Sequence, residues 1–406
     1  MPNPRLTALP LTIALTATLA WTPSTLAADD ELTLDEELIA EAIELLQERY
    51  VDESALTSEN LTIGALRGIV EALGDDGHTE YLTEEEYKIE REVLEGSVAG
   101  VGIVLDQRSA APLIVSVVDG SPAEIAGLQS GDIIATVNGA ETARMPDGEL
   151  AERVRGEPGT PVRLGVERSG IDERQEFLVM RAEIEIDPVS WSFAPGSDVA
   201  VVRMVQFSVG AGHQFREAVQ DLVDEGASAV VVDLRGNPGG LLAEMLNAAS
   251  AFLDDGVAFL EQGRDEVPEP IRVDPDRAVD AEIPVVVIVD YGTASAGEIL
   301  AAALRDNDRA TVIGNQTFGT GTILNNLRLS DGSALRLGVR QWLTPAGEAV
   351  FRVGVAPDEE VDLPAGAVRL VPDDLMALTA LDFEGSSDVQ LRRAVRLAEA
   401  MVDRAG

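Results

Sequence analysis

The spacing of apolar and polar positions changes twice along the chain and so predicts three structural regions. From Leu32 to about Gly96, apolar residues recur at spacings of three and four, as in LDEELIAEAIELLQERY and TIGALRGIVEALG. This spacing predicts a small helical lead-in, with a glycine suited to a C-cap after the second segment. Between Gly96 and about Ala182, short β-like runs such as VGIVLD, PLIVSVV and DIIATVNG are separated by Gly, Pro and Asp turns. The middle region is therefore expected to be a compact β-rich module.

From about Asp187 onward, predicted strands alternate with predicted helices. The strands are VAVVRMVQF, AVVVDLRG and IPVVVIVD, and the helices run through QFREAVQDLVDEG, LLAEMLNAASAFL and GEILAAALRDN. Such alternation predicts an α/β layer fold with its apolar strands buried between helices. The last segment, SDVQLRRAVRLAEAMVDRAG, predicts a closing amphipathic helix. We therefore expect a helical segment at 28–96, a β-rich module at 97–182 and an α/β core at 183–406.

Residues 1–27 have the pattern of a secretory signal. One early cation, Arg5, precedes an apolar run from Leu6 to Trp21, and the segment ends in the small-residue sequence Thr25-Leu26-Ala27. The alternative is a membrane anchor, but the run is broken by Pro10 and shorter than the roughly 20 residues that span a bilayer. No later segment is long and apolar enough to be a second span. We expect an exported protein, periplasmic or extracellular and soluble, without disulfides, because the chain has no cysteine.

Charge and composition exclude several classes of function. The chain of 406 residues has 30 basic and 72 acidic residues, a net charge of −42 that would repel nucleic acid. With 45% hydrophobic residues, it has enough apolar material to fold. No cluster of metal-ligating residues, phosphate loop or dinucleotide fingerprint appears, so no metal and no cofactor are expected. The sequence contains no signal for a particular oligomeric state.

The first candidate for chemistry is the strand-to-helix junction in IPVVVIVDYGTASAGEILAAAL. An apolar strand ends at Asp290, a turn with a glycine follows, and Ser295 lies where a helix of small residues begins. Unpaired N–H groups at a helix N-terminus suit a nucleophile whose attack creates an oxyanion. The alternative is that Ser295 is only an N-cap, with Glu298 as its capping-box partner.

The second candidate is the junction in AVVVDLRGNPGGLLAEML. Asn237, Pro238, Gly239 and Gly240 connect a buried strand to the next helix, and successive glycines let backbone N–H groups approach a ligand. Two such loops in one α/β layer can face one another, one giving a nucleophile and the other an oxyanion donor. The alternative is an ordinary tight connection.

Several motifs follow one another in the order found in one protein family. GTASAGEI, LRGNPGG, NQTFGTGTI and LTPAGEAVFRVGVAPDEEV resemble segments of the C-terminal processing proteases, also called tail-specific proteases. SVAGVGIVLD and SPAEIAGLQSGDIIATVNG resemble their PDZ module, and GDDGHTEYL resembles their N-terminal DPHS-type motif. The resemblance covers about Leu61 to Val402. It implies a crotonase/ClpP-like α/β protease core with an inserted PDZ domain, acting as a serine endopeptidase on proteins recognised by their C-terminal tails.

The resemblance also assigns roles to residues. Ser295 takes the place of the nucleophile, and Gly239 or Gly240 with the amide of Ala296 takes the place of the oxyanion hole. Asp306 matches an acidic position that is sometimes assigned to the charge relay. It follows Ser295 by three helical turns, about 16 Å of rise, so a structural salt bridge or a helix-end role is the expectation from geometry.

The chain departs from the family at the catalytic base. The family uses a Ser/Lys dyad with its lysine inside TFGKG, whereas this chain has Thr320 at that position and Leu324 where a glutamine usually follows. Threonine cannot accept a proton at neutral pH. The only lysine, Lys88, has Glu84 and Glu92 at helical spacings of four and is expected to be solvated and ion-paired.

Two histidines remain as candidate bases for the serine. His213 lies just ahead of a predicted helix, matches no family motif and is expected to be a surface or helix-start residue. His78 lies in the DPHS-like motif, from which tricorn-type relatives take the histidine of a Ser/His/Glu arrangement. The position of their glutamate corresponds to Phe351 and Arg352 here. The candidates for the orienting acid are Glu348, Asp75 and Asp76.

The PDZ-like segment has a function of its own. Gly100-Val101-Gly102-Ile103 matches the carboxylate-binding loop, in which backbone N–H groups hold a peptide C-terminus while the peptide extends a sheet edge. We expect Val101 and Ile103 to line an apolar groove that binds protein or peptide C-termini; the alternative is a spacer without ligand. The whole chain is then an active serine peptidase with His78 as base, or a pseudoprotease scaffold that binds peptides.

Overall fold

The computed structural model describes residues 34–405, except 54–55, 75–78, 107–111, 119, 130, 146–148, 169–170, 172, 275–282 and 365–366. The expected signal, 1–27, and His78 lie outside the described residues. The chain divides into two compact units, Met1–Thr62 and Ile63–Gly406. No helix in the described part is long and apolar enough to cross a membrane.

The first unit contains helix α1 (Glu36–Arg49), capped by the side chain of Asp35, which accepts a hydrogen bond from the amide of Leu38 at 3.0 Å. None of its residues is buried. Helix α2 (Ser58–Glu71) begins in this unit and continues into the second. The predicted helical lead-in is thus present, with a further helix, α3 (Glu84–Leu94), in the second unit.

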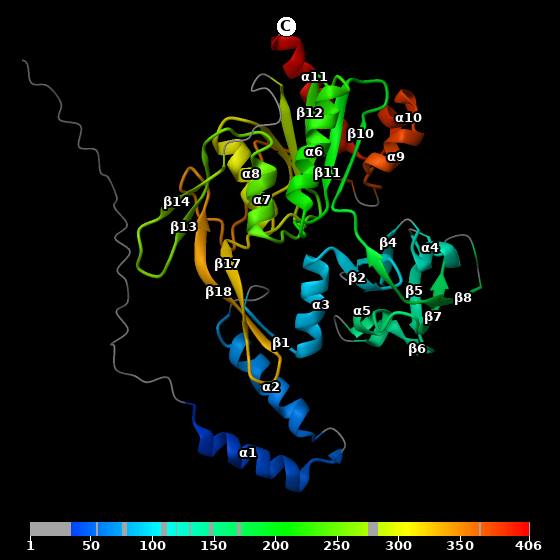
Figure 1. Cartoon of the computed structure of the whole chain (residues 1–406). Coiled ribbons are helices and arrows are strands. Elements are labelled where there is room, and N and C mark those ends of the chain that lie inside the picture. The colour runs from blue at the N-terminus through cyan, green and yellow to red at the C-terminus, as the bar shows by residue number, and fades with distance from the viewer. Residues whose placement is uncertain are drawn as a thin grey trace, which may run out of the picture. The chain divides into compact units, whose positions relative to one another are not determined.

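The α/β core is built on a six-stranded sheet in the order β10-β11-β12-β15-β16-β19. Its strands β10, β11 and β12 are labelled in Figure 1. Only β10 is antiparallel to its neighbour; the other pairs are parallel. The helices that cross over between the parallel strands pack on one face of the sheet, and the C-terminal helices cover the other face. The strands are β10 (Val189–Phe193), β11 (Val199–Met204), β12 (Ala229–Asp233), β15 (Val285–Val289), β16 (Thr311–Gly314) and β19 (Glu359–Glu360).

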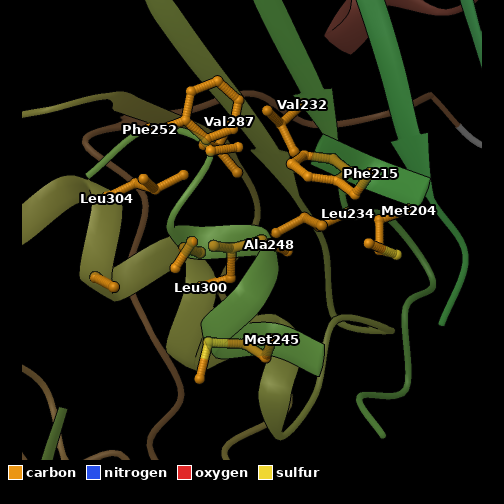
Figure 2. Packing of buried hydrophobic residues seen from close by; sticks show 14 of the residues in the cluster. Met204, Phe215, Val232, Leu234, Met245, Ala248, Phe252, Val287, Leu300 and Leu304 are labelled. Atoms are coloured by element: carbon orange, nitrogen blue, oxygen red, sulfur yellow. The ribbon is translucent and has the colours of Figure 1, made fainter. Parts of the chain in front are cut away.

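Alternate residues of each central strand enter two separate cores. Val230, Val232 and Val287 pack with helices α6 (Ala211–Asp224), α7 (Leu242–Ala249) and α8 (Ala296–Asp306). Figure 2 shows side chains of α7 and α8, such as Met245 and Leu300, in this cluster. The opposite face packs against α9 (Pro372–Ala377), α10 (Ala380–Gly385) and α11 (Val389–Ala405). This packing confirms the α/β layer fold.

A second sheet contains five strands, in the order β1-β18-β13-β14, with β17 also paired to β18. Its β1 strand comes from the lead-in and pairs with β18 in antiparallel register, so that Tyr81 lies opposite Leu335. The expectation of an entirely helical lead-in is therefore corrected by one short strand. The strands are β1 (Glu80–Leu82), β13 (Val257–Gln262), β14 (Glu269–Arg272), β17 (Thr322–Arg328) and β18 (Ala334–Leu343).

The β-rich module is built on a sheet in the order β3-β4-β5-β7-β8, with β6 paired to β5. A separate pair joins β2 to β9. The buried face of the sheet forms its own core with residues such as Ile114, Ile134 and Val162. The elements are β2 (Ser97–Gly100), β3 (Ile103–Asp106), β4 (Leu113–Val117), α4 (Pro122–Ala126), β5 (Ile133–Val137), β6 (Ala140–Glu141), η2 (Thr142–Arg144), α5 (Glu149–Val154), β7 (Pro161–Glu167), β8 (Gln175–Met180) and β9 (Ala182–Glu185).

Candidate active site

Ser295 lies between the end of β15 and the first residue of α8, in a backbone conformation that few residues adopt. Its φ is 50° and its ψ is −119°, whereas an N-cap residue normally has extended angles. A non-glycine residue in this region carries a strain of roughly 1–3 kcal/mol, which persists only where the surroundings hold it in place. A strained turn between a strand and a helix is also a known way to expose a nucleophilic serine. This geometry is not required for capping alone.

The carboxylate of Glu298 holds the residues around Ser295 together. One oxygen accepts hydrogen bonds from the Thr317 hydroxyl at 2.5 Å and the Gly319 amide at 2.7 Å. The other accepts from the amides of Ser295 and Thr320, both at 2.9 Å. Burial raises the pKa of Glu298, although these hydrogen bonds oppose the shift. The expected capping partner thus also fixes a loop that lies some twenty residues further along the chain.

Thr320 lies directly beside Ser295. Its hydroxyl accepts a hydrogen bond from the Ser295 amide at 3.2 Å, and its side chain is almost fully buried. The loop that carries Thr320 is pressed against the following segment, because a Cβ on Gly321 would lie 2.2 Å from the amide nitrogen of Phe351. The two positions that the family resemblance relates, Ser295 and Thr320, are therefore neighbours in space.

The two glycine-containing loops face one another, joined by Asp290. Its carboxylate accepts hydrogen bonds from the amides of Gly236 and Gly292, both at 2.9 Å. The hydroxyl of Thr293 donates to the carbonyl of Leu234 at 2.8 Å, and the amide of Ala294 donates to the carbonyl of Asn237 at 2.9 Å. The loop after β12 and the loop after β15 therefore form one hydrogen-bonded unit.

Gly239 lies against Ser295. A Cβ on Gly239, whose φ is +100°, would lie 2.7 Å from the Ser295 Cβ and 3.0 Å from the Ala296 amide nitrogen. The absence of a side chain therefore keeps the space in front of the serine open. The Gly239 amide itself donates to the Asn237 side chain at 2.8 Å. Of the two glycines considered as oxyanion donors, Gly240 is the one whose amide has no acceptor among the described residues.

A buried ion cluster supports the loop after β12. Arg235 is fully buried and pairs with Asp233 at 2.8 Å and with Asp388, just before α11, also at 2.8 Å. Burial opposes a charge on Asp233, but the guanidinium groups of Arg235 and Arg203 outweigh it and lower the pKa of Asp233 to about 2. The cluster ties the start of the loop to the opposite face of the sheet.

Two other candidate bases are placed on the surface, as predicted. The Nζ of Lys88, on α3, lies 3.6 Å from the carboxylate of Glu92, and the lysine side chain is 74% exposed. His213 is in the first turn of α6, and its Nε2 lies 3.4 Å from the carboxylate of Glu217. Neither side chain belongs to the group of residues around Ser295.

The acids proposed near the C-terminal end of α8 are held by Arg305. Asp306 accepts from the Arg305 Nε at 2.7 Å and from the Ala346 amide at 3.0 Å, which is the expected structural salt bridge. Glu348 pairs with the same guanidinium at 3.1 Å. Because Arg305 is ten residues after Ser295 on a helix that rises about 1.5 Å per residue, Glu348 is at the wrong end of α8 to orient a base at Ser295. This corrects the expectation for Glu348.

His78, with Asp75 and Asp76, lies outside the described residues, but its chain neighbours are placed. The carbonyl of Gly74 accepts a hydrogen bond from Arg352, whose amide donates to Gly319 at 2.8 Å. The hydroxyl of Thr79 accepts from the Gly338 amide at 3.2 Å, and Gly338 lies opposite Leu324 in the β17–β18 ladder. Residues on both sides of the segment are thus hydrogen-bonded to Arg352 and Gly338, which pair with Gly319 and Leu324 on either side of Thr320.

The predicted carboxylate-binding loop lies between β2 and β3, and β3 is an edge strand. Gly102 has a φ of +86°, and a Cβ there would lie 2.2 Å from the Ser121 Cβ, so only glycine fits. Val101 is 1% exposed and belongs to the core of the module, which corrects the expectation that its side chain lines a groove. Ile103 is partly buried against the same core.

Sequence reasoning did not find the residues that connect the loops. Asp290 and Asn237 were visible only as neighbours of Ser295 and of the glycines. The partners that connect them to other loops, Gly236 for Asp290 and Met204 for Asn237, lie more than thirty residues away in the chain. The sequence signal for Asp290 was its position directly after a buried strand and two residues before Gly292-Thr293. No group of three or more His, Cys, Asp or Glu side chains suited to a metal occurs in the described part of the chain.

Comparison with known proteins defines first the class of this chain. Residues 198–361, which include both glycine-containing loops and Ser295, match the sequence model of peptidase family S41, a family of serine-type peptidases. Residues 113–168 match that of the PDZ domain. The chain thus belongs to the class of serine-type peptidases that carry a PDZ domain.

The relatives define the family more closely. A "carboxyl-terminal-processing protease" of Synechocystis is 35% identical over 345 residues, which cover 83% of this chain and 80% of that protein. The "carboxy-terminal processing protease CtpA" of Bacillus subtilis is 33% identical over 307 residues, 75% of this chain and 65% of that protein. The chain belongs to the carboxyl-terminal-processing protease family.

A solved structure supports the same assignment. The "photosystem II D1 C-terminal processing protease" superimposes with a TM-score of 0.57 at 28% identity, covering 86% of this chain and 98% of that one. A putative S41 protease from Bacteroides fragilis superimposes with a TM-score of 0.56 at 18% identity and shows a shared fold. The predicted protease-type α/β core with an inserted PDZ domain is confirmed.

Proposed function

We propose that this chain is an exported serine endopeptidase that cleaves proteins recognised by their C-terminal tails, with Ser295 as its nucleophile. The observation that carries the proposal is the strained conformation of Ser295, with a φ of 50°, opposite a glycine that leaves the space before it open. The surrounding hydrogen bonds to Glu298 and Thr320 hold that conformation. A serine that acted only as a helix cap would need neither feature.

In the proposed reaction, the Ser295 Oγ attacks a peptide carbonyl and loses its proton to a base. The negative oxygen is stabilised by the amides of Ala296 and Gly240, and the base then gives the proton to the departing amine. Water hydrolyses the acyl-enzyme in a second step, which regenerates the serine. A Cβ at position 239 would fill the space in front of Ser295 and Ala296 that the carbonyl needs.

The proposed base is His78. Thr320 takes the position of the family's lysine, and a threonine hydroxyl cannot serve as a base near neutral pH. Lys88 and His213 are on the surface, beside Glu92 and Glu217, which leaves His78 as the candidate base. The contacts of Gly74 and Thr79 with the region around Thr320 support this role.

The proposed recognition element is the PDZ domain. Because β3 is an edge strand, an extended peptide can pair with it while its terminal carboxylate meets the amides of the Gly100–Ile103 loop. The signal-like pattern of residues 1–27 supports export to the periplasm or the outside of the cell.

The test uses an unfolded substrate protein with an apolar C-terminus, prepared with either a free or an amidated terminal carboxylate. We expect the mature chain to cleave the free form at least several-fold faster, with products identified by mass spectrometry. Equal rates for the two forms would remove the PDZ domain from substrate selection. No cleavage of either form would contradict the peptidase function.

A second candidate function is a pseudoprotease that binds peptides without cleaving them. The observation in its favour concerns Thr320, which takes the position of the family's catalytic lysine. Its hydroxyl accepts a hydrogen bond from the Ser295 amide and supplies no base for the Ser295 hydroxyl. Binding of the free-carboxylate tail without any cleavage would support this candidate.

A further inference from the structure

Two exposed aromatic side chains lie on the loops that position Ser295. Tyr291, in the turn between β15 and Ser295, is 58% exposed, and Phe318, two residues before Thr320, is 38% exposed. Their ring centroids are 5.6 Å apart, and the ring planes are tilted by 58°. Among the described aromatic residues, only Tyr50 is comparably exposed. Tyr291 and Phe318 are the two exposed aromatic residues of the described chain that contact each other, so this pair requires its own explanation.

The backbone beneath the pair is fixed by the same contacts that hold the serine. The amide of Phe318 donates to the carbonyl of Thr293 at 3.0 Å. A Cβ on Gly292, which follows Tyr291, would lie 2.9 Å from the Gly236 Cα, so the turn is packed tightly. The two rings therefore form a pre-organised surface, whose use in binding costs little conformational entropy.

We propose that Tyr291 and Phe318 form an apolar subsite for a side chain of the polypeptide that lies across Ser295. The inference rests on the proposed function, because it takes Ser295 as the residue that meets the polypeptide. An aromatic pair of this geometry binds aliphatic or aromatic side chains by burial and ring contacts. The subsite therefore selects substrates with an apolar residue close to the bond that is cleaved.

The charges around the pair favour the same class of side chain. The carboxylate of Asp290, next to Tyr291 in the chain, is bonded to the amides of Gly236 and Gly292 and paired with Arg369 at 2.9 Å. It is therefore already neutralised and offers little to a basic side chain. The net charge of −42 disfavours an acidic one. The surroundings of Tyr291 and Phe318 therefore favour an apolar side chain.

The experiment measures binding without turnover, on a Ser295→Ala background of the mature chain. The probes are short unstructured peptides, amidated at the C-terminus so that the PDZ domain cannot hold a carboxylate, with one central residue varied among Leu, Phe, Ala and Asp. Binding is followed by fluorescence anisotropy. The variants are Tyr291→Ala and Phe318→Ala, with Tyr291→Phe to keep the ring and Leu381→Ala as a control. Leu381 is 82% exposed and lies on α10.

We expect each alanine variant to bind the Leu and Phe peptides roughly fivefold to tenfold more weakly, with the Asp peptide unchanged. Tyr291→Phe and Leu381→Ala should bind as the parent does. Equal affinity of the parent for the Leu and Asp peptides, an equal loss for all peptides, or no binding by the parent would each overturn the proposal. A chain without peptidase activity fails the proposed function and can still show this preference, so the two failures are distinguishable.

Discussion

Replacing Glu298 by Gln is the sharpest test of how the site is held together. The substitution keeps the size of the side chain and exchanges one carboxylate oxygen for an NH₂ group, which donates hydrogen bonds and cannot accept them. In the structure, one oxygen receives Thr317 and Gly319, and the other receives Ser295 and Thr320. In either orientation of the glutamine amide, its NH₂ group therefore faces groups that also donate hydrogen bonds.

Either orientation of the amide leaves one buried backbone amide without an acceptor. If the NH₂ group takes the position facing Ser295 and Thr320, the Thr320 amide loses its acceptor, whereas the Ser295 amide keeps the Thr320 hydroxyl at 3.2 Å. If it faces Thr317 and Gly319, the Thr317 hydroxyl can rotate to accept, and only the Gly319 amide is left without a partner. A buried donor without an acceptor costs about 1–3 kcal/mol, so in either orientation the free energy of unfolding should fall by about that amount.

The assay is urea unfolding followed by circular dichroism, together with the rate of substrate cleavage. Glu244→Gln is the matched control. The Glu244 carboxylate also accepts two backbone amides, those of Gly210 and Gly212 at 3.0 and 2.9 Å, but it is half-buried, so water can replace a lost acceptor. We expect a smaller loss of stability there and unchanged cleavage. If Glu298→Gln unfolds at the same urea concentration as the wild type and cleaves substrate at the wild-type rate, the Glu298 carboxylate does not hold the site together.

Three further perturbations test other parts of the account. Thr320→Lys should raise the rate of tail cleavage at least several-fold, because it supplies an amine beside Ser295; an unchanged rate would count against an intact site. Gly102→Val should abolish tail binding in a calorimetric titration, because a Cβ at this position meets Ser121 at 2.2 Å and the loop must move; unchanged affinity would remove the loop from recognition. The pKa of Asp233, about 2, lies below its ordinary value of 3.8, so its ionised form contributes about 2 kcal/mol of stability above pH 4. That contribution should be lost as the pH falls towards 2, and Asp233→Asn should remove this part of the pH dependence of urea unfolding; an Asn variant with the wild-type pH dependence would contradict the assignment.

Local pattern was sufficient for the α/β core and marked Ser295 as a candidate at a strand-to-helix junction, whereas only the family resemblance assigned it the role of nucleophile. Strand 285–289 is a short run of β-branched residues between Pro284 and Asp290, and helix 296–306 is a longer segment of small and apolar residues, so length and composition indicate their type. The position of Ser295 followed from the same pattern, because a buried strand, a glycine and a helix of small residues leave it at the junction.

The contacts that decide the chemistry were not accessible to local pattern. Glu298 has the spacing of a capping partner, and nothing near it in sequence indicates that Thr317, Gly319 and Thr320 share its carboxylate. In the same way, Val101 lies between two glycines in a loop motif but is buried in the module's core. Both outcomes depend on segments that meet only after the chain has folded.

The central claim is that Ser295 is an activated nucleophile although the chain has no lysine beside it. The most direct measurement is the initial rate of cleavage of an unfolded, apolar-tailed substrate as a function of pH, for the wild type, Ser295→Ala and His78→Ala. The account predicts activity in the wild type that rises through the pH range in which a histidine loses its proton, about 6 to 7, and no activity in either variant. Tail binding by all three forms without cleavage by any would contradict it and establish a peptide-binding scaffold.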